Sequence, residues 1–392
     1  MSVNKRYFQN RILSWYACHR RRLPWRAGKS RRERDPYRVS VSEVMLQQTQ
    51  VDRVIPYYKR WMERWPTVRH LARARLASVI KAWAGLGYNR RAVYLHEAAI
   101  TVVAEFGGEF PRSEEELVKL PGVGRYTARA ILAFASGKDV GVLETNTKRV
   151  LLRIFFGTNS FRDLKILLNK EASAHSLRTQ RMGEERVPHE RSVRISPLSS
   201  YTTKHLRHKG SSDSGRYPEG FAWLILNSCV QRGERKAFGL KGNKSIQYFE
   251  KTLLVLADGV VPKGKGDEWN QALMDFGAMV CTAKRPKCEE CPVKKMCSWY
   301  RNQMQNSKLK SQNYNAKVKT PEKRERFEET DRYFRGRIVD ALRGSSFSAE
   351  SLREYLEMRH GLSSRERFDR LITDLGSDGL IKVDSSRLVS LP

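Results

Sequence analysis

Long hydrophobic runs are missing from this sequence of 392 residues. No apolar stretch approaches the roughly 20 residues that a membrane-spanning helix requires. The first 26 residues also lack the continuous apolar region of a secretory signal peptide. The first absence excludes a membrane-spanning helix, and the second argues against secretion. We therefore expect a soluble intracellular protein, located in the cytoplasm or, in a bacterium, with the nucleoid.

Acidic residues are scarce relative to basic ones. The chain has 42 Asp and Glu against 74 Lys and Arg, which gives a formal net charge of +32. So large an excess favours a phosphate-rich partner, and nucleic acid is the first candidate. An anionic membrane surface is the alternative. The length predicts two or three domains.

Cysteine is also rare, and four of the six cysteines are clustered. Cys281, Cys288, Cys291 and Cys297 follow the spacing Cys-x6-Cys-x2-Cys-x5-Cys, whereas Cys18 and Cys229 stand alone. Four thiolates within seventeen residues can surround a soft-metal centre, either zinc or an iron–sulfur cluster. A disulfide pair is the alternative, but nothing else indicates an oxidising compartment. Spacing alone leaves zinc and a [4Fe-4S] cluster open.

Strand alternation is scarce in residues 1–157, which read as consecutive helices of an all-α domain. Phe8, Ile12 and Trp15 share one face of the first. In the stretch from Ser42 to Trp65, apolar residues recur at helical spacing, and Pro56 is expected to break that stretch into two helices. The recurring residues are Val44, Val51, Ile55, Tyr58 and Met62. Later helical units are expected at 76–83, 91–105, 114–119, 125–136 and 145–155.

The pattern changes after residue 157. Residues 158–245 are largely polar and basic and predict a disordered insert. Helical pattern resumes in 246–300, where one helix leads directly into the four-cysteine loop. Its expected core face is made by Trp269, Leu273, Phe276 and Val280. Residues 301–328 form a charged linker.

Residues 329–392 predict a small separate domain. Three helical stretches, at 331–343, 348–358 and 364–376, precede two short segments that read as a hairpin. Three helices and a hairpin are typical of a winged helix. A plain helical tail is the alternative.

The segment LPGVGRYTARAILAFA (120–135) joins two helices through Gly122 and Gly124. These glycines allow a tight turn that exposes backbone N–H groups. The second helix begins near Arg125, and its N-terminus can hold a phosphate. Taken alone, the segment is also compatible with an ordinary helix–turn–helix connection.

Several motifs in chain order resemble one protein family. LPGVGRYTA is similar to the helix–hairpin–helix of the DNA glycosylase superfamily that includes endonuclease III. VSEVMLQQTQV (41–51), AGLGYNRRAVYLHEAA (84–99) and WNQALMDFGAMVC (269–281) resemble its MutY-type adenine glycosylases, as do LPWR (23–26) and LETNTKRVLLRIF (143–155). The resemblance covers residues 8–157 and 246–298. It implies a two-lobed helical fold with DNA in the cleft, a [4Fe-4S] cluster on the four cysteines, and removal of adenine mispaired with guanine or 8-oxoguanine.

The resemblance also implies catalytic roles. A base must leave the duplex before its glycosidic bond can be cleaved, and two carboxyl groups assist the cleavage. Glu43 is expected to protonate adenine, because burial beside Val44 would favour its protonated form. Glu144 takes the place of the second carboxylate, where the family usually has Asp followed by Gly-Asn. Tyr126 lies where bifunctional relatives have their Schiff-base lysine, so lyase activity should be weak or absent.

Further residues are expected to contact DNA or the base. Gln48 and Tyr88 resemble residues that wedge into the duplex, and Arg26 and Leu46 resemble residues of the adenine pocket. Gly122, Gly124 and Asn146 complete this set. The expected partner is double-stranded DNA with an A·G or A·8-oxoguanine mismatch, bound by a monomer.

Two features depart from the family. The Nudix-like C-terminal domain that recognises 8-oxoguanine has no counterpart, because residues 329–392 are too few and too helical. Glu144 is also one methylene longer than the usual Asp. A thymine or uracil glycosylase acting opposite guanine therefore stays open as an alternative, as does a catalytically weak DNA-binding relative.

Overall fold

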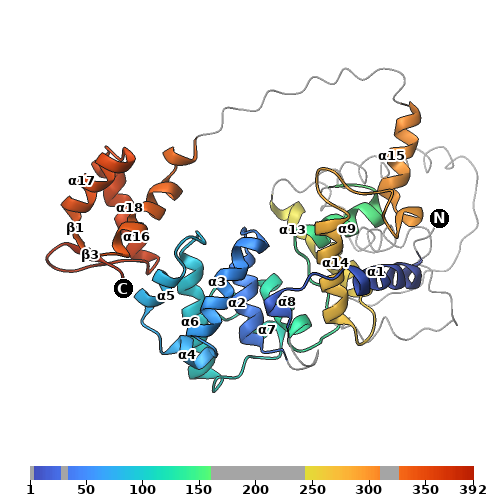
Figure 1. Ribbon diagram of the computed structural model, residues 1–392, viewed down its shortest axis with the longest axis horizontal. Helices are drawn as coiled ribbons and strands as arrows, with labels where there is room; N and C mark the ends of the chain where they lie inside the picture. Colours follow the sequence, from blue (N-terminus) through green and yellow to red (C-terminus); the bar gives the residue numbers. More distant parts are fainter. Residues whose placement is uncertain (1–3, 28–33, 160–242, 310–325) are drawn as a thin grey trace, which may run out of the picture. The chain divides into compact units, whose positions relative to one another are not determined.

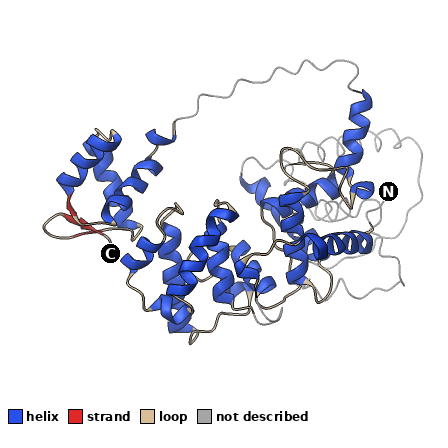
Figure 2. Cartoon of the chain, viewed as in Figure 1, coloured by secondary structure: helices blue, strands red, loops and turns tan. Residues whose placement is uncertain are grey.

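The computed structural model describes residues 4–27, 34–159, 243–309 and 326–392, which are helical apart from one small sheet (Figure 1, Figure 2). This confirms the predicted all-α class. Most of the expected insert at 158–245 and part of the expected linker at 301–328 lie outside the described residues, as does Cys229.

The first part of the chain contains α1 (Lys5–His19), η1 (Pro24–Arg26), α2 (Pro36–Leu46), α3 (Val51–Arg64), α4 (Val68–Ala72), α5 (Leu76–Ala82), α6 (Arg90–Glu105), α7 (Glu114–Leu117), α8 (Arg125–Phe134), α9 (Thr145–Leu151) and a π-helical turn, η2 (Leu152–Phe156). The later part contains α13 (Asn243–Gly259), α14 (Gly266–Met279), η6 (Lys294–Met296), α15 (Ser298–Leu309), η7 (Phe327–Glu329), α16 (Asp331–Leu342), β1 (Phe347–Ser348), α17 (Ala349–His360), α18 (Arg365–Ser377), β2 (Lys382–Val383) and β3 (Leu388–Ser390).

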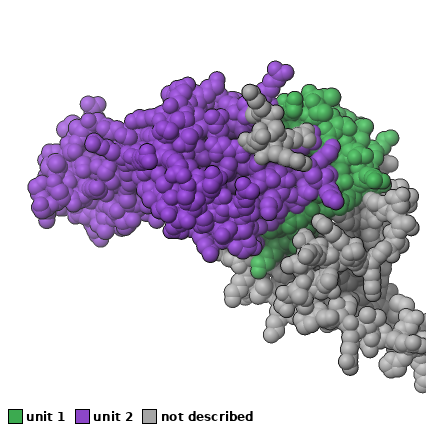
Figure 3. Space-filling model, turned by 90° about the horizontal axis from the view of Figure 1, so that it is seen from below, with its two compact units in different colours: residues 1–20, 143–261, 269–312 green, residues 21–142, 262–268, 313–392 purple. Residues whose placement is uncertain are grey.

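The chain divides into two compact units, neither of which is continuous in sequence (Figure 3). The first unit combines residues 1–20, 143–261 and 269–312, and the second combines residues 21–142, 262–268 and 313–392. The domain boundaries expected from the sequence, at 157, 245, 300 and 328, stay predictions.

Buried aromatic rings organise the core of the first unit. Phe8 packs edge-to-face on Trp269 at 5.2 Å between ring centroids, and Trp15 packs in the same manner on Phe276 at 5.4 Å. The faces predicted for α1 and α14 are thus directed into this core, although Trp15 is only partly buried. These contacts join the N-terminal helix to a helix more than 250 residues later in the chain.

The expected break at Pro56 is wrong. α3 continues from Val51 to Arg64 with Pro56 inside it, and the chain breaks earlier, between Leu46 and Val51. Proline removes one backbone hydrogen bond, but Pro56 and Asp52, the residue four positions before it, are both exposed. Water can therefore bind the carbonyl left without its helical partner.

The buried face of α3 also differs from the expected one. It consists of Val54, Tyr58 and Trp61, whereas Val51, Ile55 and Met62 are only partly buried. Trp61 is covered by Trp65 and Trp83, which place large rings on this side of the helix. The sequence spacing admitted either face, and tertiary packing selected this one.

Residues 331–390 form the three helices and the hairpin that the sequence predicts. β2 and β3 pair antiparallel, and β1 adds to β3, so the strand order is β1-β3-β2. Side-chain oxygens of Thr330, Ser348 and Ser364 cap the N-termini of the three helices. The apolar core of this C-terminal segment includes Ile80 and Val93 of α5 and α6, so it packs against the preceding helices of the second unit.

Among the described residues, no helix is both long and apolar enough to cross a bilayer.

Candidate functional site

Glu43 carries a buried carboxyl group. It is 6 % exposed and lies on α2, where Val39 to Met45 are all buried. A buried carboxyl group needs a hydrogen-bond partner to offset the loss of water. The phenol of Tyr126 on α8 donates a hydrogen bond to Glu43 Oε2. The structure therefore brings together two of the three predicted catalytic residues.

The turn before α8 positions Tyr126. Gly122 has φ of +70°, and a Cβ there would stand 2.6 Å from the Cβ of Tyr94. Glycine is required at this position both for its backbone conformation and for space. Gly124 is the N-cap of α8 and contributes no capping side chain, and the first turn contains no acidic residue. The N-terminal N–H groups of α8 are thus arranged as in helices that bind phosphate.

Gln48 and Tyr88 share an unusual backbone conformation. Their φ angles are +57° and +49°, and among the described residues Arg387 is the only other non-glycine residue with positive φ. Such conformations are strained and tend to occur at functional sites. Both side chains are exposed. The positive φ angles and the exposure suit side chains that project into solvent. That they wedge into a duplex stays a prediction.

Arg91 holds the two turns that carry Gln48 and Tyr88. Its buried guanidinium donates to the carbonyls of Val44 at 2.8 Å and Gln47 at 2.6 Å, and to the carbonyl of Leu86 at 3.0 Å. One side chain therefore fixes both turns. Sequence reasoning missed it, because an arginine in the run NRRA shows no periodic or motif signal of its own.

Arg26 and Leu46 are the predicted pocket residues. Arg26 ends η1, Leu46 ends α2, and both are half-buried in the second unit. Leu46 lies three residues after Glu43 and so on the adjacent turn of the same helix. Their contact with a base stays a prediction.

Glu144 lies in the first unit and caps α9. Its Oε1 accepts from the backbone N–H of Thr147 at 3.0 Å, and Thr147 Oγ1 accepts from the backbone N–H of Glu144 at 2.8 Å. Burial raises the pKa of Glu144, while hydrogen bonds from Asn146 and Thr147 oppose the rise. The longer side chain is therefore accommodated as a helix cap.

Asn146 is tied to the segment that leads into the cysteine loop. Arg149 donates to Asn146 Oδ1 at 2.7 Å and to the carbonyls of Gly277 at 2.6 Å and Cys281 at 2.8 Å. A Cβ at Gly277 would stand 2.6 Å from the Cβ of Asn146, so glycine allows α9 and α14 to approach closely. Asn146 thus has a packing role whatever its role towards DNA.

All four clustered cysteines line one cavity of the first unit. Arg153 of the π-helical turn also lines it and donates to Cys281 Sγ at 3.3 Å. Burial raises the pKa of the Cys291 thiol to about 12 and that of the Cys297 thiol to about 11. A bound cationic centre would displace those protons, as metals do from thiols. The donor set therefore suits a metal centre that binds thiolates.

Four cysteine thiolates can hold either a single zinc ion or an iron–sulfur cluster. Four thiolates around one zinc would have to converge to roughly 2.3 Å from it. A [4Fe-4S] cluster is held by four cysteine thiolates and, being larger than one ion, fits thiols spread around a cavity.

Comparison with known proteins gives the same assignment. Residues 41–172 match the family model described as HhH-GPD superfamily base excision DNA repair protein. Residues 281–297 match the iron-sulfur binding domain of endonuclease III. The first match encloses the helix–hairpin–helix, and the second runs from the first clustered cysteine to the last.

Similar proteins are found over most of the chain. The adenine DNA glycosylase of Mycolicibacterium smegmatis is 30% identical over 371 residues, which are 95% of this chain and 91% of that protein. The chain belongs to the adenine DNA glycosylase family. The family members of Rattus norvegicus and Homo sapiens are each 35% identical over 294 residues, 74% of this chain.

This member of the adenine DNA glycosylase family spans only about two-fifths of the length of its mammalian relatives, at 41% and 39% of the rat and human proteins. The solved structure of a thermostable thymine-DNA glycosylase has a TM-score of 0.50 at 24% identity and covers 76% of this chain and 97% of that protein. At this identity the likeness concerns the fold alone, and it confirms the predicted glycosylase fold.

The [4Fe-4S] prediction, which the match at 281–297 confirms, has a direct chemical test. Anaerobically purified protein should be brown and contain about four iron and four sulfide per chain. Cys291→Ser should lose most of the iron, whereas Cys18→Ser should keep it, because Cys18 is exposed on α1. One zinc per chain without iron or sulfide would contradict the assignment.

Proposed function

We propose that this protein is a monofunctional DNA glycosylase that hydrolyses the N-glycosidic bond of adenine paired with guanine or 8-oxoguanine in duplex DNA. The observation that carries the proposal is the buried Glu43 carboxyl group bonded to Tyr126. It occurs in a chain that aligns with 91% of a protein named adenine DNA glycosylase. We further propose that the protein acts as a monomer.

The proposed chemistry uses two carboxyl groups. Glu43 donates its proton to N7 of the flipped adenine as the bond between N9 and C1′ breaks, and the base leaves neutral. Glu144, ionised, stabilises the positive charge that develops on the sugar. Water then adds to C1′ and loses a proton, which restores the Glu43 acid. The products are free adenine and an abasic site.

Tyr126 supports a role for Glu43 and argues against a lyase step. Its O–H donates to Glu43 Oε2 and so orients the carboxyl group. A phenol cannot form the imine that cleaves the DNA strand in bifunctional glycosylases. Gln48 and Tyr88, with their exposed side chains, are proposed to fill the space that the flipped base vacates.

The test is single-turnover base release from four labelled duplexes that carry A·8-oxoguanine, A·G, T·G or U·G. The proposal expects release of adenine from the first two, without strand cleavage until alkali is added. Release of thymine or uracil instead would make the protein a mismatch pyrimidine glycosylase. Binding of all four duplexes without release from any would indicate a DNA-binding relative that has lost the chemistry. Light scattering of the free protein checks the proposed monomer.

A further inference from the structure

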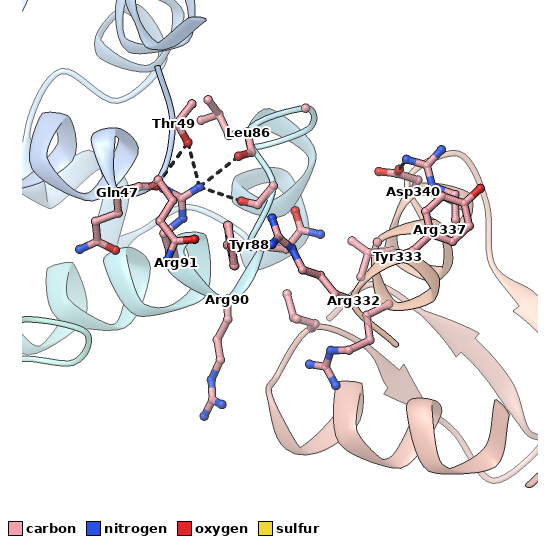
Figure 4. A pocket seen from close by; sticks show the side chains of 18 of the residues that line it. Gln47, Thr49, Leu86, Tyr88, Arg90, Arg91, Arg332, Tyr333, Arg337 and Asp340 are labelled. Atoms are coloured by element: carbon pink, nitrogen blue, oxygen red, sulfur yellow. Dashed lines mark hydrogen bonds and ion pairs between the residues drawn. The ribbon is translucent and has the colours of Figure 1, made fainter. Parts of the chain in front are cut away.

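An arginine-rich cavity lies next to Tyr88, and neither Glu43 nor Tyr126 lines it. Its volume is about 1020 Å³, and one side is formed by the turns that carry Gln47 and Tyr88, the other by α16 (Figure 4). Among the described residues that line it, seven are arginine and Asp340 is the single acidic one. The cavity belongs wholly to the second unit.

Positive charge in this cavity exceeds the negative charge that pairs with it. Asp340 pairs with Arg337 and Arg343, while Asp374 and Asp378 pair with Arg335 and Arg90. Within the described part of the chain, three carboxylates thus stand against seven guanidinium groups, which leaves a surplus of four positive charges.

The arginines also repel one another. Burial lowers the pKa of Arg91 to about 10, and the charge of Arg332 contributes to the lowering. Burial likewise lowers the pKa of Arg343, and the charge of Arg337 adds to it. Holding like charges this close is unfavourable without an anion between them.

Arg332 is the cavity arginine most available to a ligand. Its guanidinium lies over the ring of Tyr88 at 4.0 Å from the centroid. Within the described residues its guanidinium makes no hydrogen bond or ion pair but contacts only aromatic rings, and the residue is exposed, so its N–H groups are open to a ligand. Gly336, one turn further along α16, also lines the cavity and leaves space beside it, because a Cβ there would meet nothing within 4 Å.

We propose that this cavity binds the phosphate backbone of duplex DNA, with α16 of the C-terminal segment as part of the DNA-binding surface. Arginine is suited to this role because its fixed N–H groups bind phosphate oxygens in pairs. The cavity adjoins Tyr88, so phosphates bound in it would flank the point where Tyr88 enters the duplex. The entry of Tyr88 into the duplex is part of the proposed function, and the inference rests on it to that extent. Phosphate binding in the cavity does not depend on catalysis.

The surface differs from the one that a winged helix commonly presents. Such domains place their third helix in the major groove, which here would be α18. The arginines of the cavity come instead from α16, the first helix of the segment. The two modes therefore predict different effects of charge placed on α16 and on α18.

A matched pair of variants tests this. Gly336 on α16 and Gly376 on α18 both lie inside helices, and a Cβ at either would meet nothing within 4 Å. Glutamate is a better helix former than glycine, so both variants should fold. Gly336→Glu places a carboxylate in the cavity, whereas Gly376→Glu adds the same charge to α18 at a residue that does not line the cavity. Gly336→Gln controls for side-chain volume.

The measurement is fluorescence anisotropy of the full protein with a labelled duplex across a salt series. Gly336→Glu should weaken binding on the order of tenfold and reduce the slope of log K against log salt by about 1, the loss of one phosphate contact. Gly376→Glu and Gly336→Gln should stay near wild type. Equal weakening by the two glutamate variants would overturn the proposal, as would an unchanged salt slope in Gly336→Glu.

Base release measured on the same variants separates the two proposals. If wild-type protein releases no base but Gly336→Glu still weakens duplex binding selectively, the proposed enzymatic function fails and the phosphate site stands. If wild-type protein releases adenine while Gly336→Glu binds and reacts as wild type does, the phosphate site fails and the enzymatic function stands.

Discussion

Glu43→Gln should slow adenine release by orders of magnitude while leaving DNA binding intact. Glutamine keeps the shape of the side chain and can still accept the hydrogen bond from Tyr126, so the fold should be unchanged. It cannot give a proton to the leaving base. General acid catalysis contributes about 10²–10⁴-fold, and we expect the single-turnover rate on the A·8-oxoguanine duplex to fall by that factor.

Two controls make this result specific. Glu105→Gln makes the same substitution at an exposed position at the end of α6 and should leave the rate unchanged. Tyr126→Phe removes the O–H that donates to Glu43 and should slow release less than Glu43→Gln, because the acid itself remains. A Glu43→Gln enzyme that reacts at the wild-type rate would show that another group protonates the base.

Glu144→Gln should be the second most damaging change. It removes the negative charge that would stabilise the sugar cation, and loss of one such electrostatic contact costs on the order of 10²–10³-fold. The variant also replaces the carboxylate that caps α9 with an amide, which is a weaker N-cap. The free energy of unfolding should therefore fall by about 1 kcal/mol or less. Single-turnover rates and thermal unfolding, measured together, separate the two effects.

Glu144→Asp is the informative counterpart. Asp is a preferred N-cap residue and can accept the hydrogen bond from Thr147, so the helix should be as stable as in wild type. The charge is kept but moves by roughly 1.5 Å, one C–C bond. We expect its rate to lie well above that of Glu144→Gln. A folded Glu144→Gln enzyme with full activity would show that Glu144 serves only as a helix cap.

The sequence by itself determined the helical class, the cysteine loop and the family. Helical periodicity is local, so it identified the helices around Phe8 and Trp269 and the three helices after residue 330. The cysteine spacing and the turn through Gly122 are also local patterns, because a loop ligand set and a tight turn each need only a few consecutive residues.

Only the tertiary structure decided how distant residues meet. The Tyr126 hydrogen bond to Glu43 joins positions 83 residues apart, and Arg91 fixes two turns through carbonyls that no motif reveals. The continuity of α3 through Pro56 depended on exposure to water, and the choice of its buried face depended on neighbouring tryptophans. The arginines of α16 likewise read as an ordinary charged helix, and only packing against α5 and α6 brings them to Tyr88. Sequence periodicity fixes which residues share a face, but the partner of that face is set by long-range packing.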